Sequence, residues 1–295
     1  MILLFDTYSA FFRAHYALPP MSTQAGEPTA ALYGFSSLVL KLLREQPGAA
    51  LAFAVDRPQE TFRKAEYSGY KAGRARTPDA LQSQLRRLPA LLDSFGVPVL
   101  SLPGFEADDV LATVARRVRE SAAGPALVVS GDRDLLQVAR ADVQVHFIGR
   151  RGERATVYDE AAVATRFGVP PARLPSYVAL VGDVSDNLPG VPGIGPSTAR
   201  RLLTDFESAG ALLANLDRVT PDRVRALLAA HDDQILQTEQ LATLQDNLNL
   251  PNGQLCWQSV SAHALARVRD EFEALEFKSL IPRIEKLVPG GAPVP

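Results

Sequence analysis

Acidic side chains recur in this chain just after short runs of aliphatic and β-branched residues that predict buried strands. The acids and the runs that precede them are Asp6 after 2–5, Asp56 after 50–55, and Asp132 and Asp134 after 126–130. In an open parallel sheet the carboxyl ends of the strands form one edge, and ligands bind there. We therefore expect these carboxylates to converge in space.

A second group of acids opens the segment 104–120, which follows another predicted strand at 97–101. Glu106, Asp108 and Asp109 stand within four positions and are followed by an apolar helical repeat. Taken alone, they suit the first turn of a helix, where carboxylates complement the helix dipole and cap free N–H groups. The isolated stretch is therefore consistent with either a capped helix or a catalytic element.

The combination of these acids favours chemistry, although Asp132 or Asp134 alone also suits a loop or a turn. Carboxylates that share one edge repel one another unless cations or basic side chains neutralise them. A cluster of oxygen ligands without His or Cys suits hard cations, chiefly Mg²⁺ or Mn²⁺. Two such ions can promote hydrolysis, because one activates water and the other stabilises the departing oxygen.

A glycine-rich hairpin at 190–195 forms a third feature. Asp183 and Asp186 precede it, and a predicted helix that carries Arg200 follows it. Glycines allow a phosphate to approach the main chain closely, and the start of the following helix adds its dipole. Such contacts position a nucleic-acid backbone without reading its bases. The alternative is a plain tight turn between packed helices.

Basic residues are concentrated in one segment, although the whole chain has a formal net charge of -2. Residues 57–87 hold eight Lys or Arg against three Asp or Glu, and residues 67–78 interleave aromatic, glycine and basic residues. A concentration of one charge favours an anionic partner. A solvated helix face is the alternative, but the mixture of aromatic, glycine and basic residues is more typical of a mobile loop that covers a nucleic-acid strand.

The predicted elements place these features in an α/β fold. The strand-like runs, including one at 143–147, alternate with helical segments, which predicts a mostly parallel sheet flanked by helices on both faces. After about residue 170 the strand signals fade and helices follow. We expect an α/β core over 1–172, a helical DNA-binding region over 173–288, and a linker or tail over 289–295.

Composition excludes several other classes of protein. Hydrophobic residues make up 46% of the chain and charged residues 22%, which is typical of an ordered globular protein. No run of 18 apolar residues exists, so we expect no membrane partner and a cytoplasmic location. The one cysteine, Cys256, cannot form an internal disulfide or a cysteine-based zinc site. The four scattered histidines are assigned to no site.

Taken together, these stretches resemble the bacterial 5′ nuclease and flap endonuclease family, which includes the N-terminal 5′-to-3′ exonuclease domain of bacterial DNA polymerase I. The resemblance runs from residue 1 to about residue 287. The matching stretches are 6–17, 26–35, 53–74, 104–115, 130–138 and 182–203. The resemblance implies a PIN-like nuclease core with a helical arch at about 63–90, and a helix-hairpin-helix motif in the C-terminal region.

The resemblance also implies two or more Mg²⁺ or Mn²⁺ ions and the side chains that act on the scissile phosphate. The nearer ion would be held by Asp6, Asp56, Glu106 and Asp108, with Asp109 adjacent. The second ion would be held or oriented by Asp132, Asp134, Asp183 and Asp186. The catalytic residues would be Asp108 and three basic residues at the base of the arch, namely Arg63, Lys71 and Arg74, which could clamp the phosphate as charge builds on it.

DNA contacts are implied for a further set of residues. Tyr67 and Tyr70 match the aromatic residues of the arch and could stack on an unpaired base, and Arg13 matches the arginine of the first motif. The hairpin and the helix after it would contribute Gly190, Val191, Gly193, Ile194, Gly195, Ser197, Thr198 and Arg200. The family also suggests a K⁺ ion at 190–195, bound by main-chain carbonyls.

Two residues depart from the family pattern. Thr7 stands where the family usually has glycine after the first aspartate, and Gly73 stands where it often has histidine. No polymerase motifs follow the matched stretches. The chain is therefore expected to be either a free-standing nuclease or the N-terminal part of a longer polymerase, and the sequence leaves both open.

The function expected from the sequence is that of a metal-dependent 5′-to-3′ exonuclease and 5′-flap endonuclease. It would act as a monomer on DNA with a flap, a nick or a free 5′ end, in primer removal, replication and repair. One alternative is a non-catalytic module that binds DNA structures, and another is an RNA-processing nuclease of related fold. The nine acids argue against the first alternative, because a binder would gain from losing negative charge near phosphate.

Overall fold

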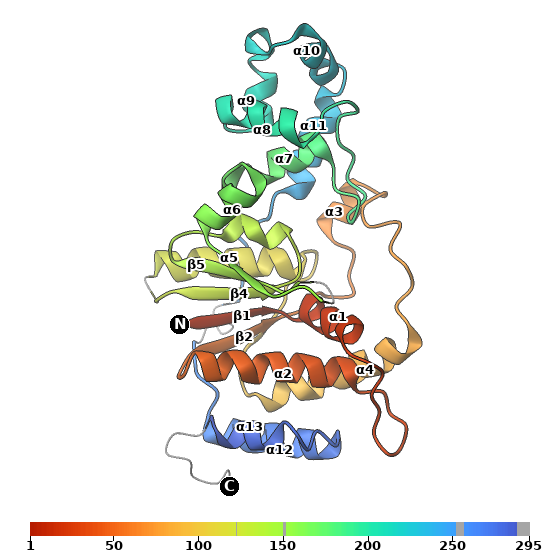
Figure 1. The fold of residues 1–295 in the computed structure, drawn as a ribbon, viewed down its shortest axis with the longest axis vertical. Coiled ribbons are helices and arrows are strands. Elements are labelled where there is room, and N and C mark those ends of the chain that lie inside the picture. Colours follow the sequence, from red (N-terminus) through yellow and green to blue (C-terminus); the bar gives the residue numbers. More distant parts are fainter. Residues whose placement is uncertain (122, 150–151, 252–256, 288–295) are drawn as a thin grey trace.

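The chain folds around one six-stranded sheet with a group of helices extending from one end (Figure 1). The structure is a computed structural model that describes residues 1–121, 123–149, 152–251 and 257–287. The predicted tail at 289–295 lies outside the described residues. No helix in the described ranges is long and apolar enough to cross a membrane.

The sheet has the strand order β3-β2-β1-β4-β5-β6, in which neighbouring strands run parallel except for the antiparallel pair β5 and β6. The strands are β1 (Ile2–Asp6), β2 (Ala50–Ala54), β3 (Val99–Leu100), β4 (Ala126–Ser130), β5 (Val143–Phe147) and β6 (Thr156–Tyr158). The mostly parallel sheet predicted from the sequence is confirmed. Only β6 was not predicted, because it is a three-residue edge strand whose side chains are largely exposed.

Both faces of the sheet are buried, so its central strands are apolar up to their last residues, Asp6 in β1 and Ser130 in β4. In β1, Leu3 and Phe5 point into one core, while Ile2 and Leu4 point into the other. The first core is covered by α1 (Thr7–Ala17), α2 (Ala30–Glu45), α4 (Asp79–Ser94), α12 (Ala262–Ala274) and α13 (Ile281–Glu285). The second is covered by α5 (Ala107–Glu120), the 3-10 helix η1 (Asp134–Val138) and α7 (Leu174–Val181).

The predicted arch at 63–90 is formed by two helices and an irregular connection. Helix α3 (Phe62–Glu66) follows β2, and residues 67–78 then run without regular structure to the start of α4. In Figure 1 this connection runs down one side of the molecule, between the helical group and α4.

The helical region predicted for 173–288 is divided between the two ends of the molecule. At one end lie α8 (Pro196–Asp205), α9 (Ala209–Leu213), α10 (Asp222–Ala229) and α11 (Asp232–Ala242), with the 3-10 turn η3 (Leu216–Arg218). Helix α6 (Glu160–Phe167) and the 3-10 turn η2 (Pro171–Arg173) precede them and lie nearer the sheet. Residues 243–250 then return along α5, and α12 and α13 pack beneath the sheet against α4. The expectation of a single helical region is therefore corrected: α12 and α13 supply apolar side chains to the core beneath the sheet.

Candidate active site

Five of the predicted carboxylates line one cavity at the carboxyl edge of the sheet. The cavity has a volume of about 460 Å³, and the acids on its wall are Asp6, Asp56, Glu106, Asp108 and Asp132. They come from four separate stretches of the chain: the end of β1, the end of β2, the start of α5 and the loop after β4. The predicted convergence of acids at this edge is thus present in the structure.

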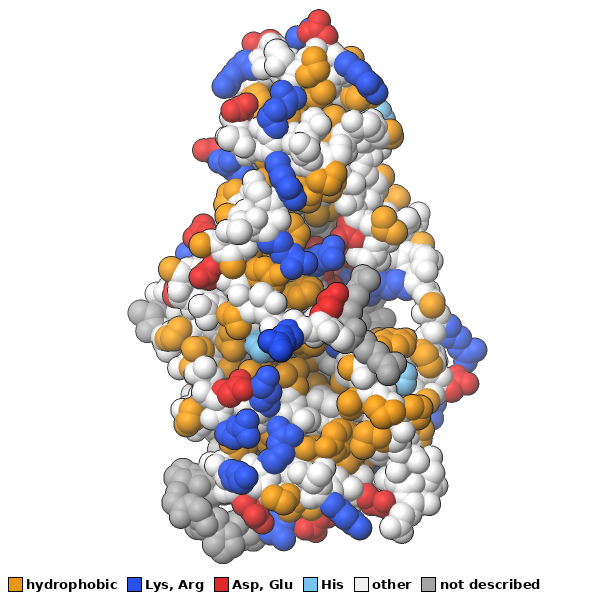
Figure 2. Space-filling model, viewed as in Figure 1, with side chains coloured by type: hydrophobic (Ala, Val, Ile, Leu, Met, Phe, Trp, Pro, Cys, Tyr) orange, Lys and Arg blue, Asp and Glu red, His pale blue; other side chains and the backbone are white. Residues whose placement is uncertain are grey.

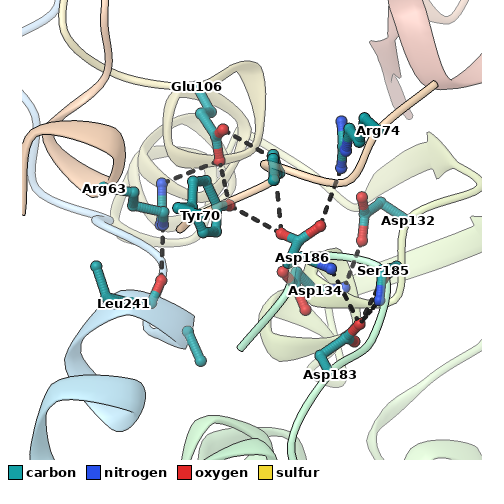
Figure 3. Close-up of polar contacts among 12 residues, drawn as sticks. Arg63, Tyr70, Arg74, Glu106, Asp132, Asp134, Asp183, Ser185, Asp186 and Leu241 are labelled. Carbon is teal, nitrogen blue, oxygen red and sulfur yellow. Dashed lines mark hydrogen bonds and ion pairs between the residues drawn. The ribbon is translucent and has the colours of Figure 1, made fainter. Parts of the chain in front are cut away.

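The remaining acids lie beside this cavity. Asp134 and Asp183 line a neighbouring hollow of about 210 Å³, and Asp183 also shares a larger one of about 520 Å³ with Asp132. Asp186 is nearly buried in the turn after α7, where it faces the basic side chains of the arch (Figure 3). These three acids therefore extend the carboxylate group toward the helical end of the molecule.

Backbone contacts fix the acids on the cavity wall. Asp6 caps helix α1, because its Oδ1 accepts the Ser9 N–H at 3.2 Å, and its Oδ2 accepts the Ser130 hydroxyl. Asp56 accepts the N–H of Ala107 at 2.7 Å, which joins the end of β2 to the first residue of α5. The carboxylates are thus part of the sheet edge and of the helix starts, as the strand pattern predicted.

Burial and mutual repulsion raise the pKa values of these acids. Burial is the largest cause for Asp6, whose pKa rises to about 7 even though the Ser130 hydroxyl opposes the shift, and Asp132 raises it further. For Asp108, burial and then the charges of Asp6 and Asp132 raise the pKa well above its ordinary value. The pKa of Asp134 is raised in the same way, by burial and then by Asp132. A bound cation would relieve this repulsion.

Two basic side chains already reach into the acids. Lys71 Nζ lies 2.8 Å from Glu106 Oε1 and 3.6 Å from Asp186 Oδ2, and Arg74 Nη2 donates to Asp186 Oδ1 at 2.9 Å (Figure 3). Burial alone would lower the pKa of Lys71, but the charges of Glu106 and Asp186 raise it above its ordinary value. Both residues lie where the sequence placed them, at the acids, and they neutralise part of the negative charge.

The acids are chemically suited to Mg²⁺ or Mn²⁺, since all are oxygen ligands in a buried, electronegative setting. In the part of the chain that the structure describes, however, no three of them converge closely enough to form a ready-made metal site. Lys71 and Arg74 instead pair with Glu106 and Asp186. The donor set thus fits the ions, and a bound ion would compete with these basic side chains for Glu106 and Asp186.

Arg63 and Asp109 are placed differently from the sequence prediction. Arg63 is only 2% exposed and forms a two-pronged ion pair with Asp109, which is fully buried. Neither side chain lines the carboxylate cavity. The expectation that Asp109 lies beside a metal ion and that Arg63 clamps a phosphate is therefore corrected. The guanidinium of Arg63 and the carboxylate of Asp109 instead bind each other.

The arch tyrosines are also placed differently. Tyr70 is buried against Leu188 and Leu241, and its Oη lies 3.0 Å from Glu106 Oε2 and 2.8 Å from Asp186 Oδ2. Tyr67 is half-buried against the same cluster. In this arrangement Tyr70 supports the carboxylates and has no ring face open to a base, which corrects its predicted role in stacking.

The hairpin predicted at 190–195 is present between α7 and α8. The side chains of Val191 and Ile194 are buried, so they anchor the turn. The exposed positions include Gly193, Gly195 and Ser197, as well as Pro192 and Pro196, and Thr198 is half-buried in the first turn of α8. Phosphate contacts at this hairpin would therefore come from main-chain N–H groups and from the start of α8.

Two predicted arginines are tied to carbonyl groups of the protein. Arg200 Nε donates to Phe167 O at 2.7 Å, although the side chain stays exposed. Arg13 Nη2 donates to Gly131 O at 2.9 Å, and its side chain lies on the wall of the carboxylate cavity. Arg13 thus lies beside the acids, while Arg200 lies at the hairpin.

Sequence reasoning missed several residues of the cavity. Tyr8, Phe12 and Tyr16 lie four residues apart along α1 and line the cavity together with Ser9. The four-residue spacing after Asp6 was a visible signal that these aromatic side chains share one helix face, and Tyr8 and Phe12 also pack partly against the core. Ser130 was missed because nothing in the sequence marks a strand serine as the partner of Asp6 across the sheet.

Comparison with known proteins identifies the chain. The family model for the N-terminal resolvase-like domain of 5′-3′ exonucleases matches residues 1–168, and the model for their C-terminal SAM fold matches residues 169–262. The chain belongs to the 5′-3′ exonuclease family. This family of nucleases thus accounts for the α/β core and for the helices that follow it, and the SAM-fold match includes the predicted helix-hairpin-helix.

Relatives of this exonuclease-family chain include longer DNA polymerases. DNA polymerase I of Mycobacterium bovis is 37% identical over 303 residues, which cover 99% of this chain and 32% of the relative. The thermostable DNA polymerase I of Thermus aquaticus is 38% identical over 280 residues, which cover 95% of this chain and 32% of the relative. The chain spans about one third of the length of these relatives.

Solved structures share the fold at low sequence identity. The bacteriophage T5 D15 protein co-crystallised with metal ions has a TM-score of 0.66 and 18% identity, with 96% of this chain and 98% of that one covered. Human GEN1 in complex with Holliday junction DNA has a TM-score of 0.62 and 13% identity, with 97% and 72% covered. These likenesses extend the fold assignment across both parts of the exonuclease-family chain.

Proposed function

We propose that this chain hydrolyses DNA phosphodiesters near a 5′ end, as a divalent-metal-dependent 5′-to-3′ exonuclease and 5′-flap endonuclease. The observation that carries the proposal is the cavity in which acids from four chain segments meet beside Lys71 and Arg74. Membership of the 5′-3′ exonuclease family supports the direction of the reaction. One structural neighbour was crystallised with metal ions and another with DNA, which supports both ligands.

The acids divide into two groups that could each hold one Mg²⁺ or Mn²⁺ ion. Bound there, the ions would supply an activated water and would neutralise charge on the departing oxygen. One ion would be held by Asp6, Asp56, Glu106 and Asp108, and the other by Asp132, Asp134, Asp183 and Asp186. Asp109 is left out of both groups, because its two oxygens already accept from Arg63.

Basic side chains of the chain would act on the substrate phosphate. Lys71 and Arg74 pair with acids of the cavity, and a phosphate that enters would compete for the same donors. Once released from Glu106 and Asp186, these donors could hold the phosphate as negative charge develops on it. Arg13, which lines the same cavity, could contact the same DNA strand.

The duplex beside the 5′ end would bind at the hairpin, through main-chain groups at Gly193 and Gly195 and the start of α8. A K⁺ ion held by main-chain carbonyls of 190–195 is part of this proposal. Lys and Arg side chains recur along the face shown in Figure 2, which suits contact with a phosphate backbone. The polymerases among the relatives support a role in primer removal, replication and repair, and hence a cytoplasmic location.

Cleavage of a 5′-flap DNA in Mg²⁺ tests this function. We expect the wild-type chain to release the flap, and Asp108→Ala and Asp134→Ala each to abolish cleavage while the protein stays folded. The matched control is Asp93→Ala, which removes an exposed carboxylate that pairs with Arg267, away from the cavity. Cleavage at the wild-type rate by either cavity variant would refute the assignment.

The same assay separates the alternatives. A non-catalytic DNA-binding module would bind the flap and leave it intact in Mg²⁺. An RNA-processing nuclease would cleave an RNA flap faster than a DNA flap of the same shape. We expect metal-dependent turnover and faster cleavage of the DNA flap.

A further inference from the structure

Every donor of the Arg63 guanidinium is already used inside the protein. A guanidinium carries five N–H groups, and five acceptor oxygens surround this one. The contacts are Nε to Leu241 O at 2.7 Å, Nη1 to Asp109 Oδ2 at 2.7 Å and Glu106 Oε2 at 3.2 Å, and Nη2 to Asp109 Oδ1 at 2.7 Å and Thr243 O at 3.1 Å. No N–H remains for a substrate phosphate.

These contacts join three segments that are far apart in the sequence. Arg63 lies on α3, Glu106 and Asp109 lie at the start of α5, and Leu241 and Thr243 lie at the end of α11. Figure 3 shows Arg63 between Glu106 and Leu241. A buried pair with full hydrogen bonding fixes geometry, because removal of one partner leaves an uncompensated charge. The carboxylate of Glu106 is thus held by Arg63, whose side chain does not line the cavity.

Asp109 extends the same connection to the segment that follows α11. Its Oδ1 also accepts the N–H of Gln245 at 2.9 Å, and its Oδ2 accepts the N–H of Glu106 at 3.1 Å. Farther along α5, the hydroxyl of Thr113 donates to Gln245 O and accepts the N–H of Leu248. We call residues 243–250 the strap, since they run along α5 through these contacts.

Helix α11 also supports the hairpin. Gln234 Nε2 donates to Gly190 O at 3.1 Å, and Thr238 Oγ1 donates to Pro189 O at 3.2 Å. One helix thus contacts the proposed duplex-binding hairpin along its length and the Arg63 guanidinium at its end. This arrangement provides a rigid path from the hairpin to Glu106.

We propose that Arg63 is a positioning residue. It fixes the Glu106 carboxylate and the start of α5 relative to the end of α11, and it makes no contact with the substrate phosphate. The proposal rests on the function proposed above. It assigns to Arg63 a role that differs from that of Lys71 and Arg74, although all three are basic residues of the same arch. Its effect on the reaction passes through Glu106.

Two variants separate positioning from contact with phosphate and from plain packing. Arg63→Gln removes the charge, and the double variant Arg63→Met with Asp109→Leu replaces the buried pair by apolar side chains, a change that often preserves stability. The matched control is Arg116→Gln. It breaks an exposed ion pair between α5 and Asp246 of the strap. If Arg63→Gln does not fold, Asp109→Asn takes its place.

DNA binding without divalent metal is measured across a KCl titration. We expect Arg63→Gln to keep the wild-type slope of log Kd against log salt, since no phosphate contact is lost. A slope reduced by about 0.9, together with weaker binding, would show that Arg63 neutralises a phosphate and would overturn the proposal.

Turnover and metal affinity test the positioning itself. At saturating DNA and Mg²⁺, we expect kcat to fall roughly 10²-fold in Arg63→Gln and to stay low in the apolar double variant even though its Tm recovers. Mn²⁺ affinity of the DNA-free protein, measured by calorimetry, should weaken in both, and the control should match the wild type in every measurement. If kcat recovers together with Tm in the double variant, the Arg63–Asp109 pair contributes only to the stability of the fold. That result would contradict the proposal.

The Mn²⁺ titration keeps this test separate from the test of function. A wild-type chain that binds Mn²⁺ but cleaves no DNA would refute the proposed function alone. Wild-type Mn²⁺ affinity in Arg63→Gln would refute the positioning role alone.

Discussion

At the scale of single residues, the neighbours Asp108 and Asp109 show how far sequence alone can separate roles. Successive residues of an α-helix point about 100° apart, so Asp108 faces the cavity while Asp109 turns toward Arg63. The sequence predicted that acids would gather at this helix start. It could not predict which of the two faces the cavity, because that depends on the rotation of α5 against the sheet.

The pKa of Asp6 gives the first prediction. Burial raises this pKa from 3.8 to about 7, so the folded chain binds the proton more tightly than the unfolded chain does. Between these two pH values the unfolded chain binds fewer protons, and the free energy of unfolding falls as the pH rises. We expect Asp6→Asn to raise the Tm of the metal-free protein at about pH 8, by roughly 2–4 °C for each kcal/mol of repulsion removed.

The Asn variant should bring no comparable gain at about pH 4, where Asp6 is largely protonated in the folded chain. Calorimetry at both pH values measures the difference. An equal gain at the two pH values would mean that the ionised carboxylate does not cause the destabilisation.

At the scale of elements, the segment 67–78 is held by its charges more than by regular structure. Lys71 has a left-handed backbone (φ 55), and its N–H donates to Asp186 O, so the segment enters the cavity at a fixed point. The family resemblance implied the arch, and the interleaved residues indicated a basic loop rather than a regular helix. The inward position of Tyr70 could not be predicted, because its apolar neighbours are distant in the sequence: Leu188 lies in the turn after α7 and Leu241 on α11.

Loss of the two basic tethers should expose this segment. We expect chymotrypsin to cleave Lys71→Ala with Arg74→Ala several-fold faster than the wild type, after Tyr67 or Tyr70, because the ion pairs to Glu106 and Asp186 are gone. The control is Arg76→Ala, whose side chain is highly exposed and pairs only with Asp79. Equal cleavage of the double variant and the control would show that other contacts hold the segment.

The hairpin is the second element whose geometry can be tested. A Cβ on Gly190 would lie 2.3 Å from the carbonyl carbon of Val181 and 2.4 Å from the N atom of Gly182, both of which are backbone atoms. Gly190→Ala should therefore push the hairpin away from α7 and destabilise the fold by about 1–3 kcal/mol.

Gly195→Ala is the matched control for the hairpin. No atom lies within 4 Å of a Cβ at this position, and its φ is -97°. Chemical denaturation of the two variants should show a loss for Gly190→Ala only. A similar stability for both would contradict the close approach of hairpin and helix.

At the scale of the whole molecule, the sequence predicted the strands of the sheet and the acids at their carboxyl ends. It did not predict where the segments after α11 lie. Buried strands followed by acids were found as expected, because apolar runs and turns are local signals. The strap at 243–250 could not be predicted, because its sequence has no helical or strand period and its position depends on contacts with Asp109 and Thr113. The return of α12 and α13 beneath the sheet was missed because it too depends on contacts between distant segments.

The arrangement of cavity, hairpin and basic face predicts how the molecule reads DNA. The proposed main-chain and basic contacts would go to phosphates, so binding should depend on the shape of the substrate and little on base sequence. We expect Kd to weaken steadily as KCl rises, and two flap DNAs of the same shape but unrelated sequence to bind alike. A strong preference for one sequence in the same titration would point to base contacts.

The location of bound metal tests the central claim most directly. Crystals of the wild-type chain soaked in Mn²⁺ and measured for anomalous scattering should show two ions in the carboxylate group, one beside Asp6 and Asp108 and one beside Asp134 and Asp183. Lys71 should have moved away from Glu106, and no ion should lie at the Arg63–Asp109 pair. An absence of Mn²⁺ from the cavity, or an ion bound by Asp109, would contradict a metal-dependent nuclease site of this composition.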